Sequence, residues 1–443
     1  MGISSRVARA AGLVALVGIV VAPGIYWDGG VLDAEARHFI LAYTKGRGLL
    51  ESIFDPRRTD WGLYQARELS YFFDYVDAKV WRALQQLGLV IFVPLSSLLG
   101  SGLLAFQVLQ RGRELLPGAA PYRMALLLAL FSNVVVFFSN AVYYRSAKIL
   151  LAAALVTFAL ELVRVLRNAP ATRYWKLGAA GLVMSLLDRQ GFFFLLCALC
   201  IVLPSWLRDR AGLNRLLACI VATVVLATFY NLILGPVLIR TISGYWPSFE
   251  YQRIPLWTAL TAPEIHWRAV QILSEQARLF FGNGAWPVSV LLLSAGAVDR
   301  LRRRRSRSDG FALLSLGLVV ALLHLLIALM VFRHPPVFEI PDHRYWYYFL
   351  TLQVVFFLLL AFYLEWLELP DLRWIRVATV SLLLALAANN VRHYGAYSDV
   401  VIHSSWFGES YRQSLLIREA LETGVRPEGL DKLSWRVVRR ARR

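Results

Sequence analysis

Residues 147–166 read AKILLAAALVTFALELVRVL, an almost uninterrupted apolar run that is long enough to cross a bilayer as one helix. Runs of this kind recur along the whole chain. Hydrophobic residues make up 58% of the 443 residues, more than the roughly 45–50% found in soluble domains. The composition therefore predicts an all-α, polytopic membrane protein.

We expect about eleven transmembrane helices, because that many apolar runs approach the length of a span. The spans are expected at roughly 11–26, 88–109, 123–141, 147–166, 174–188, 190–206, 215–235, 285–299, 311–332, 345–366 and 373–391. Residues 1–391 would then form a single transmembrane domain, followed by an extracytoplasmic C-terminal tail at 392–443. The first run lacks a convincing small-residue cleavage site, so we expect it to stay in place as an anchor.

The basic residues predict how the chain is oriented. A net charge of +18 is compatible with nucleic-acid binding, but arginines kept in cytoplasmic loops explain it more simply. The cluster Arg300–Arg307 would hold its loop inside, which places the N-terminus inside and the long loops 27–87 and 236–284 outside. Arginine supplies nearly all the basic residues, a usage typical of GC-rich bacteria, so we expect a bacterial cytoplasmic (inner) membrane.

The two long outer loops are each expected to contain an amphipathic helix that lies flat in the membrane interface. Within 63–88, apolar residues recur at helical spacing and charged residues lie mostly between them. Residues 266–281 repeat the pattern, with Trp267, Val270 and Phe280 on the expected apolar side.

Polar residues at the mouths of the expected helices converge on the outer face. The first outer loop opens with WDGGVLDAEARH at 27–38, a group of carboxylates beside a membrane in an otherwise basic chain. Its simplest explanation is a solvated acidic loop. The cations of the third turn, Arg145 and Lys148, are also explained as headgroup anchors, and Asp188-Arg189 as a structural turn between helices.

Taken together, these clusters predict a site for a phosphorylated lipid, with carboxylates for base chemistry and cations for the phosphate. The expected site consists of the catalytic carboxylates Asp33 and Glu35, the phosphate-binding cations Arg145, Lys148, Arg189 and Arg344, and the supporting residues Arg37, His38, Arg67, Asp188, His343 and Tyr345.

The layout resembles that of the GT-C glycosyltransferases, polytopic enzymes that use polyprenyl-phosphate sugars as donors. The resemblance covers most of the chain: one N-terminal span, a long acidic outer loop, interfacial helices and further spans joined by short turns. Residues 33–38, Asp-Ala-Glu-Ala-Arg-His, are similar to the family's Asp-Glu-x-Arg-Tyr pattern, but an alanine separates the two acids. Either Asp33 or Glu35 therefore remains open as the base. Arg344-Tyr345 resembles an Arg-Tyr step in a late outer loop of several members.

The resemblance implies inverting transfer of a sugar from a polyprenyl-phosphate donor to a glycan, lipid or protein acceptor at the outer face. One carboxylate would take the proton of the acceptor hydroxyl, and the cations would stabilise the departing phosphate. Some relatives use a divalent metal. Asp33 and Glu35 could be ligands, but two oxygen donors do not make a metal site by themselves.

Three other functions fit parts of the same pattern. An O-antigen polymerase or ligase would use a late outer loop, where His334, Asp342 and His343 lie. A transporter of lipid-linked sugars would share the spans and the basic residues, but it is expected to show internal repeats, which this sequence lacks. A structural scaffold explains the spans but not the shared location of the polar clusters.

Overall fold

The computed structural model describes most of the chain. The described residues are 3–26, 31–32, 48–54, 63–64, 66–87, 94–136, 142–143, 147–167, 174–208, 210–249, 257, 261–282, 285–303, 307–333, 349–367, 373–396 and 405–442. Within them the chain folds into α-helices and short π- and 3-10-helical turns, with four two-residue strands. The all-α prediction is therefore confirmed for this part of the chain.

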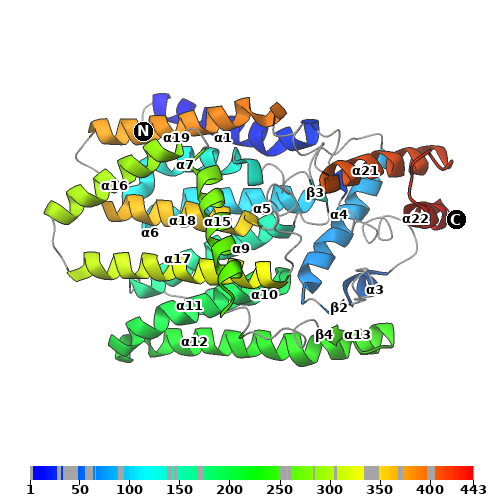
Figure 1. Cartoon of the computed structure of the whole chain (residues 1–443), viewed down its shortest axis with the longest axis horizontal. Coiled ribbons are helices and arrows are strands. Elements are labelled where there is room, and N and C mark those ends of the chain that lie inside the picture. Colours follow the sequence, from blue (N-terminus) through cyan, green and yellow to red (C-terminus); the bar gives the residue numbers. More distant parts are fainter. Residues whose placement is uncertain are drawn as a thin grey trace.

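Most of the long helices lie side by side along one direction and form an elongated bundle (Figure 1). This bundle contains α1 (Ile3–Tyr26), α9 (Ala147–Leu166), α10 (Tyr174–Leu187), α11 (Arg189–Arg208), α12 (Arg210–Phe229), α16 (Trp286–Arg303), α17 (Arg307–Arg333), α18 (Leu350–Leu367) and α19 (Arg373–Arg392). Shorter segments complete it: α5 (Leu95–Phe106), the π-turn η2 (Gln107–Arg111), α6 (Gly112–Leu115), the 3-10 turn η3 (Pro117–Tyr122) and α7 (Arg123–Phe131).

The bundle has central and peripheral helices, as their burial shows. The apolar windows of α9 and α18 are 67% buried, whereas those of α17 and of the segment 213–243 are only 28% buried. A helix that is apolar all round must face either a protein core or lipid. We conclude that α9 and α18 form the core, and that α12 and α17 present apolar surface outward.

Four helical segments of the described chain are long and apolar enough to cross a membrane: 147–166, 213–243, 314–332 and 350–367. They indicate a multi-pass membrane protein. The prediction of about eleven spans is not reproduced. Three of the expected spans are shorter apolar helices, at 9–22, 174–187 and 189–203.

The sequence predicts more spans than the structure contains among its described residues, because an apolar run does not indicate where a helix breaks. In the expected span 88–109, the α-helix α5 has 12 residues and then becomes the π-turn η2. In the span expected at 123–141, α7 has only nine residues. The opposite occurs after α12, which continues through the π-turn η4 (Tyr230–Leu234) into α13 (Gly235–Ser243).

Helix α15 (Pro263–Phe280) runs across the bundle rather than along it (Figure 1). Polar contacts hold it there. His266 Nδ1 lies 3.0 Å from His324 Nε2 on α17, and Gln353 of α18 donates to the Gln276 side chain at 2.8 Å. The helix expected over 266–281 is thus present, but Trp267 and Val270, expected on its apolar side with Phe280, are 65% and 45% exposed. The buried face is offset because the bundle accepts its neighbours Ala269 and Ile272 instead.

One end of the bundle gathers α3 (Leu49–Phe54), α4 (Glu68–Gln86), α13, α21 (Ser405–Thr423) and α22 (Lys432–Arg442) (Figure 1). We call it the α4 end. The last residues of α16 and α18 and the first residues of α17 and α19 lie at the opposite end. The C-terminal helices pack directly on α4: Ala78 and Trp81 share a small hydrophobic core with Ile417 and Ala420 of α21 and Val438 of α22.

Two parallel strand pairs connect segments that are distant in sequence, and the sequence did not predict them. The strand β1 (Val31–Leu32) pairs with β3 (Val142–Tyr143). The strand β2 (Leu63–Tyr64) pairs with β4 (Ser248–Phe249). The β1–β3 pair joins the loop 27–87 to the segment before α9. The β2–β4 pair joins the loop 27–87 to the loop 236–284.

Candidate functional site

A buried carboxylate, Asp188, lies at the centre of a charged cluster at the α4 end. Its Oδ2 accepts a hydrogen bond from Lys148 Nζ at 2.8 Å and lies 3.4 Å from Arg67 Nε. The side chains of Lys148 and Asp188 are each only 5% exposed. Burial removes most of the water that would hydrate these two charges. Their mutual attraction offsets that cost only if the two groups stay at hydrogen-bonding distance.

The local sequence explains why Asp188 is placed there. Asp188 separates α10 from α11, and its Oδ1 accepts the backbone N–H of Gln190 at 3.0 Å, which is the arrangement of a helix N-cap. The turn is so tight that a Cβ on Gly191 would lie 2.0 Å from the carbonyl oxygen of Met184. Glycine at 191 therefore permits the turn, and aspartate at 188 satisfies the exposed N–H groups of α11.

The electrostatics of the cluster keep Asp188 ionised. Burial alone would raise the pKa of this carboxyl, but the charges of Lys148 and Arg67, together with the Gln190 hydrogen bond, hold it below its ordinary value. Asp188 is thus an anion at neutral pH. It is suited to orienting cations and unsuited to donating a proton.

Helix α4 brings a further carboxylate to the cluster, Asp74, which is 5% exposed. Glu68 is also buried, but its hydrogen-bond partner is Tyr230 of η4. A small cavity of about 10 Å³ lies between Arg67, Ser70, Tyr71, Asp74, Lys148, Leu187 and Asp188. This volume admits about one water molecule. The next carboxylate along α4, Asp77, accepts the backbone N–H of Ser96 at 2.9 Å and so caps α5. We assign Asp77 a structural role.

A second, larger cavity begins at the residue after Asp188. It has a volume of about 240 Å³, and its walls include Arg189 and Phe192 of α11, Asn231 of η4, and Ala66. Arg189 is the charged residue of this wall, Ser185 and Thr228 add hydroxyl groups, and Leu232 adds apolar surface. Such a combination can accept an amphipathic molecule with one anionic group.

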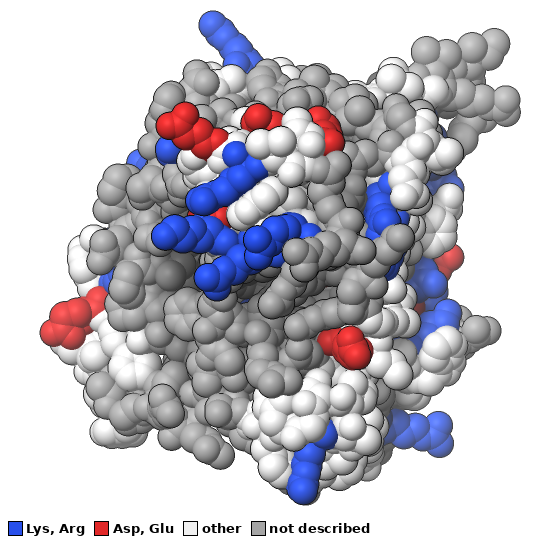
Figure 2. Space-filling view, turned by 90° about the vertical axis from the view of Figure 1, so that its right-hand side faces the viewer, with Lys and Arg blue, Asp and Glu red and all other residues white. Residues whose placement is uncertain are grey.

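Figure 2 looks directly at the α4 end and shows Lys and Arg side chains gathered close to Asp and Glu side chains. Helix α22 contributes exposed cations at this end, namely Lys432, Arg436 and Arg439. Basic groups are thus available at the surface as well as in the buried cluster.

The structure brings together four of the residues that the sequence predicted for the site: Arg67, Lys148, Asp188 and Arg189. The other predicted members lie outside the described residues; they are Asp33, Glu35, Arg37, His38, Arg145, His343, Arg344 and Tyr345.

The β1–β3 pair brings the first loop beside the segment that precedes α9. Leu32, the residue before Asp33, pairs with Tyr143, and Tyr143 precedes Lys148 by five residues in sequence. No sequence pattern predicts this pairing, because strands of two residues are too short to show a period.

Glu68, Asp74 and Gln190 belong to the polar clusters that the sequence indicated, but they are not among the residues expected to form the site. For the first two a signal was present, since a helix expected to lie at the membrane interface carries three acids within ten residues at 68–77. Gln190 accepts a hydrogen bond from the Thr351 hydroxyl and so connects α11 to α18. That contact spans 161 positions, and no local pattern predicts it.

No group of three or more His, Cys, Asp or Glu side chains that could hold a metal ion occurs among the described residues. The expected metal ligands Asp33 and Glu35 lie outside them. Comparison of the chain with protein-family models, with curated proteins and with solved structures finds no match.

Proposed function

We propose that this protein is an integral-membrane glycosyltransferase that transfers a sugar from a polyprenyl-phosphate donor to an acceptor at the α4 end. The observation that supports it is the cluster of Arg67, Lys148 and Asp188, buried where the apolar helices of the bundle end. Ionisable groups at such depth are costly and typically serve a function.

Capping alone does not account for the cluster. An N-cap needs one aspartate or asparagine and no cation, whereas Asp188 also holds Lys148 and Arg67. Asp74 is buried beside them. The cost of desolvating so many charges favours a role in binding or catalysis over a purely structural one.

In the proposed reaction, Arg189 contacts the donor phosphate from the wall of the 240 Å³ cavity, and Arg67 and Lys148 lie behind it. Asp188 keeps both of those cations in place. Arg145 and Arg344 are the further cations expected from the sequence. Positively charged groups placed before the reaction begins stabilise the charge that develops on a leaving phosphate.

The chemical step is a single displacement at the anomeric carbon. Asp33 or Glu35 accepts the proton of the acceptor hydroxyl, and the freed oxygen forms the new glycosidic bond. The bond from the anomeric carbon to the phosphate oxygen breaks, and the polyprenyl phosphate leaves with the electron pair. The configuration at carbon is therefore inverted. We place the reaction on the external face of a bacterial cytoplasmic membrane, with the N-terminus inside.

The test is transfer of radiolabelled sugar from a panel of polyprenyl-phosphate donors by the purified full-length protein. We expect transfer from at least one donor, and loss of it in the Arg189→Gln variant. Arg392→Gln, which removes an exposed arginine at the end of α19, serves as the matched control. Movement of intact donor across vesicles with no transfer from any donor would instead identify a transporter and refute the proposal.

A further inference from the structure

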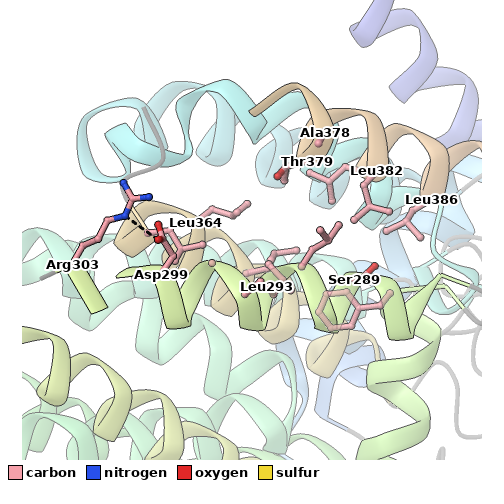
Figure 3. A pocket seen from close by; sticks show the side chains of 16 residues that line it. Ser289, Leu293, Asp299, Arg303, Leu364, Ala378, Thr379, Leu382 and Leu386 are labelled. Atoms are coloured by element: carbon pink, nitrogen blue, oxygen red, sulfur yellow. Dashed lines mark hydrogen bonds and ion pairs between the residues drawn. The ribbon is translucent and has the colours of Figure 1, made fainter. Parts of the chain in front are cut away.

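An apolar cavity of about 320 Å³ lies between α16, α18 and α19, remote from Asp188 (Figure 3). Its walls are mainly leucine side chains, among them Leu293 of α16, Leu364 of α18, and Leu382 and Leu386 of α19. Figure 3 shows these side chains facing a common space. We call this space the α16–α19 groove.

The charged residues of the groove are confined to one end. Asp299 and Arg303 lie there in the last turns of α16, and Arg303 Nε donates to Asp299 Oδ1 at 2.8 Å. Ser289 lies at the other end. Arg303 follows Ser289 by fourteen positions, which corresponds to about 21 Å along a helix axis. The groove is thus long, narrow and amphipathic.

The last turn of α16 carries three arginines, Arg300, Arg302 and Arg303. Arg302 and Arg303 are exposed, and the Arg300 guanidinium lies 5.1 Å from the centre of the Trp366 ring. Asp299 offsets only one of the three positive charges. This end of the groove therefore attracts an anion.

Helix α16 is poorly packed, although its sequence is apolar. Ser289 is the buried residue of this helix, while Val288, Leu291 and Val298 are exposed. Protein interiors contain few voids larger than a water molecule. In a bilayer, the material available to fill an apolar space of this length is a hydrocarbon chain.

We propose that the α16–α19 groove binds one acyl chain of an anionic glycerophospholipid, whose phosphate is held by Arg302 and Arg303. Basic pockets between transmembrane helices at one membrane face are suited to such headgroups. The bound lipid would join α16 to α18 and α19 and replace the missing side-chain contacts. The site lies toward the end opposite α4 (Figure 1), so this inference does not depend on the proposed transfer reaction.

Native mass spectrometry of the full-length protein, titrated with defined lipids, tests the headgroup assignment. We expect phosphatidylglycerol to bind more tightly than phosphatidylcholine with the same acyl chains. Arg302→Gln and Arg303→Gln should each weaken phosphatidylglycerol binding about fivefold, the effect of one basic residue near an anionic lipid surface. Arg392→Gln at the other end of α19 should leave it unchanged. Equal binding of the two lipids would refute the anionic headgroup.

Two neighbouring residues of α19 test the position of the acyl chain. Ala378 lines the groove, whereas Val377 is 64% exposed and is not part of its wall. Ala378→Trp should abolish high-affinity phosphatidylglycerol binding, and Val377→Trp should preserve it. Thr379→Phe, which also fills the groove, replaces Ala378→Trp if thermal unfolding shows that the latter is misfolded. Wild-type binding in a folded groove-filling variant would overturn the proposal, and so would displacement of phosphatidylglycerol by a lower concentration of polyprenyl phosphate.

Discussion

The two ends of helix α9 both carry paired charges, but in different surroundings. At its start, Lys148 pairs with Asp188, and both side chains are 5% exposed. Near its end, Arg164 pairs with Glu114 at 3.1 Å, and these side chains are 23% and 72% exposed. An exposed pair of this kind needs no functional explanation, because it contributes little to stability and its charges remain hydrated. Burying a pair of charges costs desolvation free energy, so a buried pair calls for a functional explanation.

This difference predicts that substitutions of the buried pair at the α4 end affect activity and stability strongly, whereas substitution of the exposed Glu114 at the opposite end of α9 does not. The largest effect is expected for the carboxylates of the first loop. Asp33→Asn keeps the size of the side chain but removes a base, so the transfer rate should fall roughly 10²–10⁴-fold if Asp33 accepts the proton.

The measurement is the rate of sugar transfer at saturating donor, with donor affinity as its control, because the substitution should not alter binding. Glu35→Gln is the paired variant that decides between the two acids. Near-normal transfer in both variants would exclude the first loop as the source of the base, and would direct attention to Glu68 and Asp74 on α4.

The next largest effect concerns the stability that Asp188 contributes. Asp188→Asn preserves the cap of α11, since asparagine is an equally good N-cap, but it deprives buried Lys148 of this carboxylate. Removing one partner of a buried pair typically costs about 3–5 kcal/mol. We expect the free energy of unfolding to fall by that amount, as measured by fluorescence-monitored unfolding in detergent.

The double variant Asp188→Asn/Lys148→Met completes the cycle and isolates the interaction of the pair. It should be more stable than Asp188→Asn alone, because the buried ammonium has been removed as well. Strictly additive losses would show that Lys148 and Asp188 do not stabilise each other, and the contrast between the two ends of α9 would then disappear.

The same pair predicts a dependence of stability on pH. Because the pKa of Asp188 lies below its ordinary value in the folded protein, its contribution is fully present above pH about 4 and is lost as the pH falls through the folded pKa. Unfolding measured at pH 7 and in strong acid should therefore differ more for the wild type than for Asp188→Asn. An equal acid sensitivity would mean that other carboxylates are responsible.

Donor binding should respond to Arg189 to a smaller extent. Arg189→Gln removes the guanidinium from the 240 Å³ cavity, and loss of a buried charge contact typically costs about 2–5 kcal/mol of binding free energy. Arg189→Lys should also weaken binding if the phosphate is held by two parallel hydrogen bonds. Equilibrium binding of a labelled donor measures both, and wild-type affinity in both variants would place the phosphate elsewhere.

Much of the fold follows from the sequence because hydrophobic periodicity is a local property. The runs at 147–166 and 350–367 are helices with the expected bounds or nearly so, and the amphipathic pattern near 266–281 is the crosswise helix α15. Helix breaks are less local. The π-turn at 107–111, QVLQR, lies at the polar end of an apolar run, and that at 230–234 continues one; neither differs in composition from an ordinary stretch of α-helix.

For the site, the sequence indicated residue types and sides of the membrane but not partners. Asp188 and Lys148 are 40 positions apart, and Arg67 approaches from a separate helix-bearing loop. Each alone resembles an anchor or a turn. Their contact depends on how α4, α9 and α10 pack, which no pattern within a single segment encodes. The same holds for the β1–β3 pair, whose two residues per strand are too few to produce a period.

The smallest effect is expected at the opposite end of α9, from Glu114→Gln. This change removes the charge that Arg164 meets at 3.1 Å, but the Glu114 side chain is 72% exposed, so water solvates both partners once the pair is lost. Arg164 also retains Glu161, 3.7 Å away. We expect the free energy of unfolding to change by at most about 1 kcal/mol, less at high salt, and the rate of transfer to stay at the wild-type value. A loss of unfolding free energy comparable to that of Asp188→Asn would mean that burial does not distinguish the two pairs. Burial would then no longer support the α4 end as the functional site.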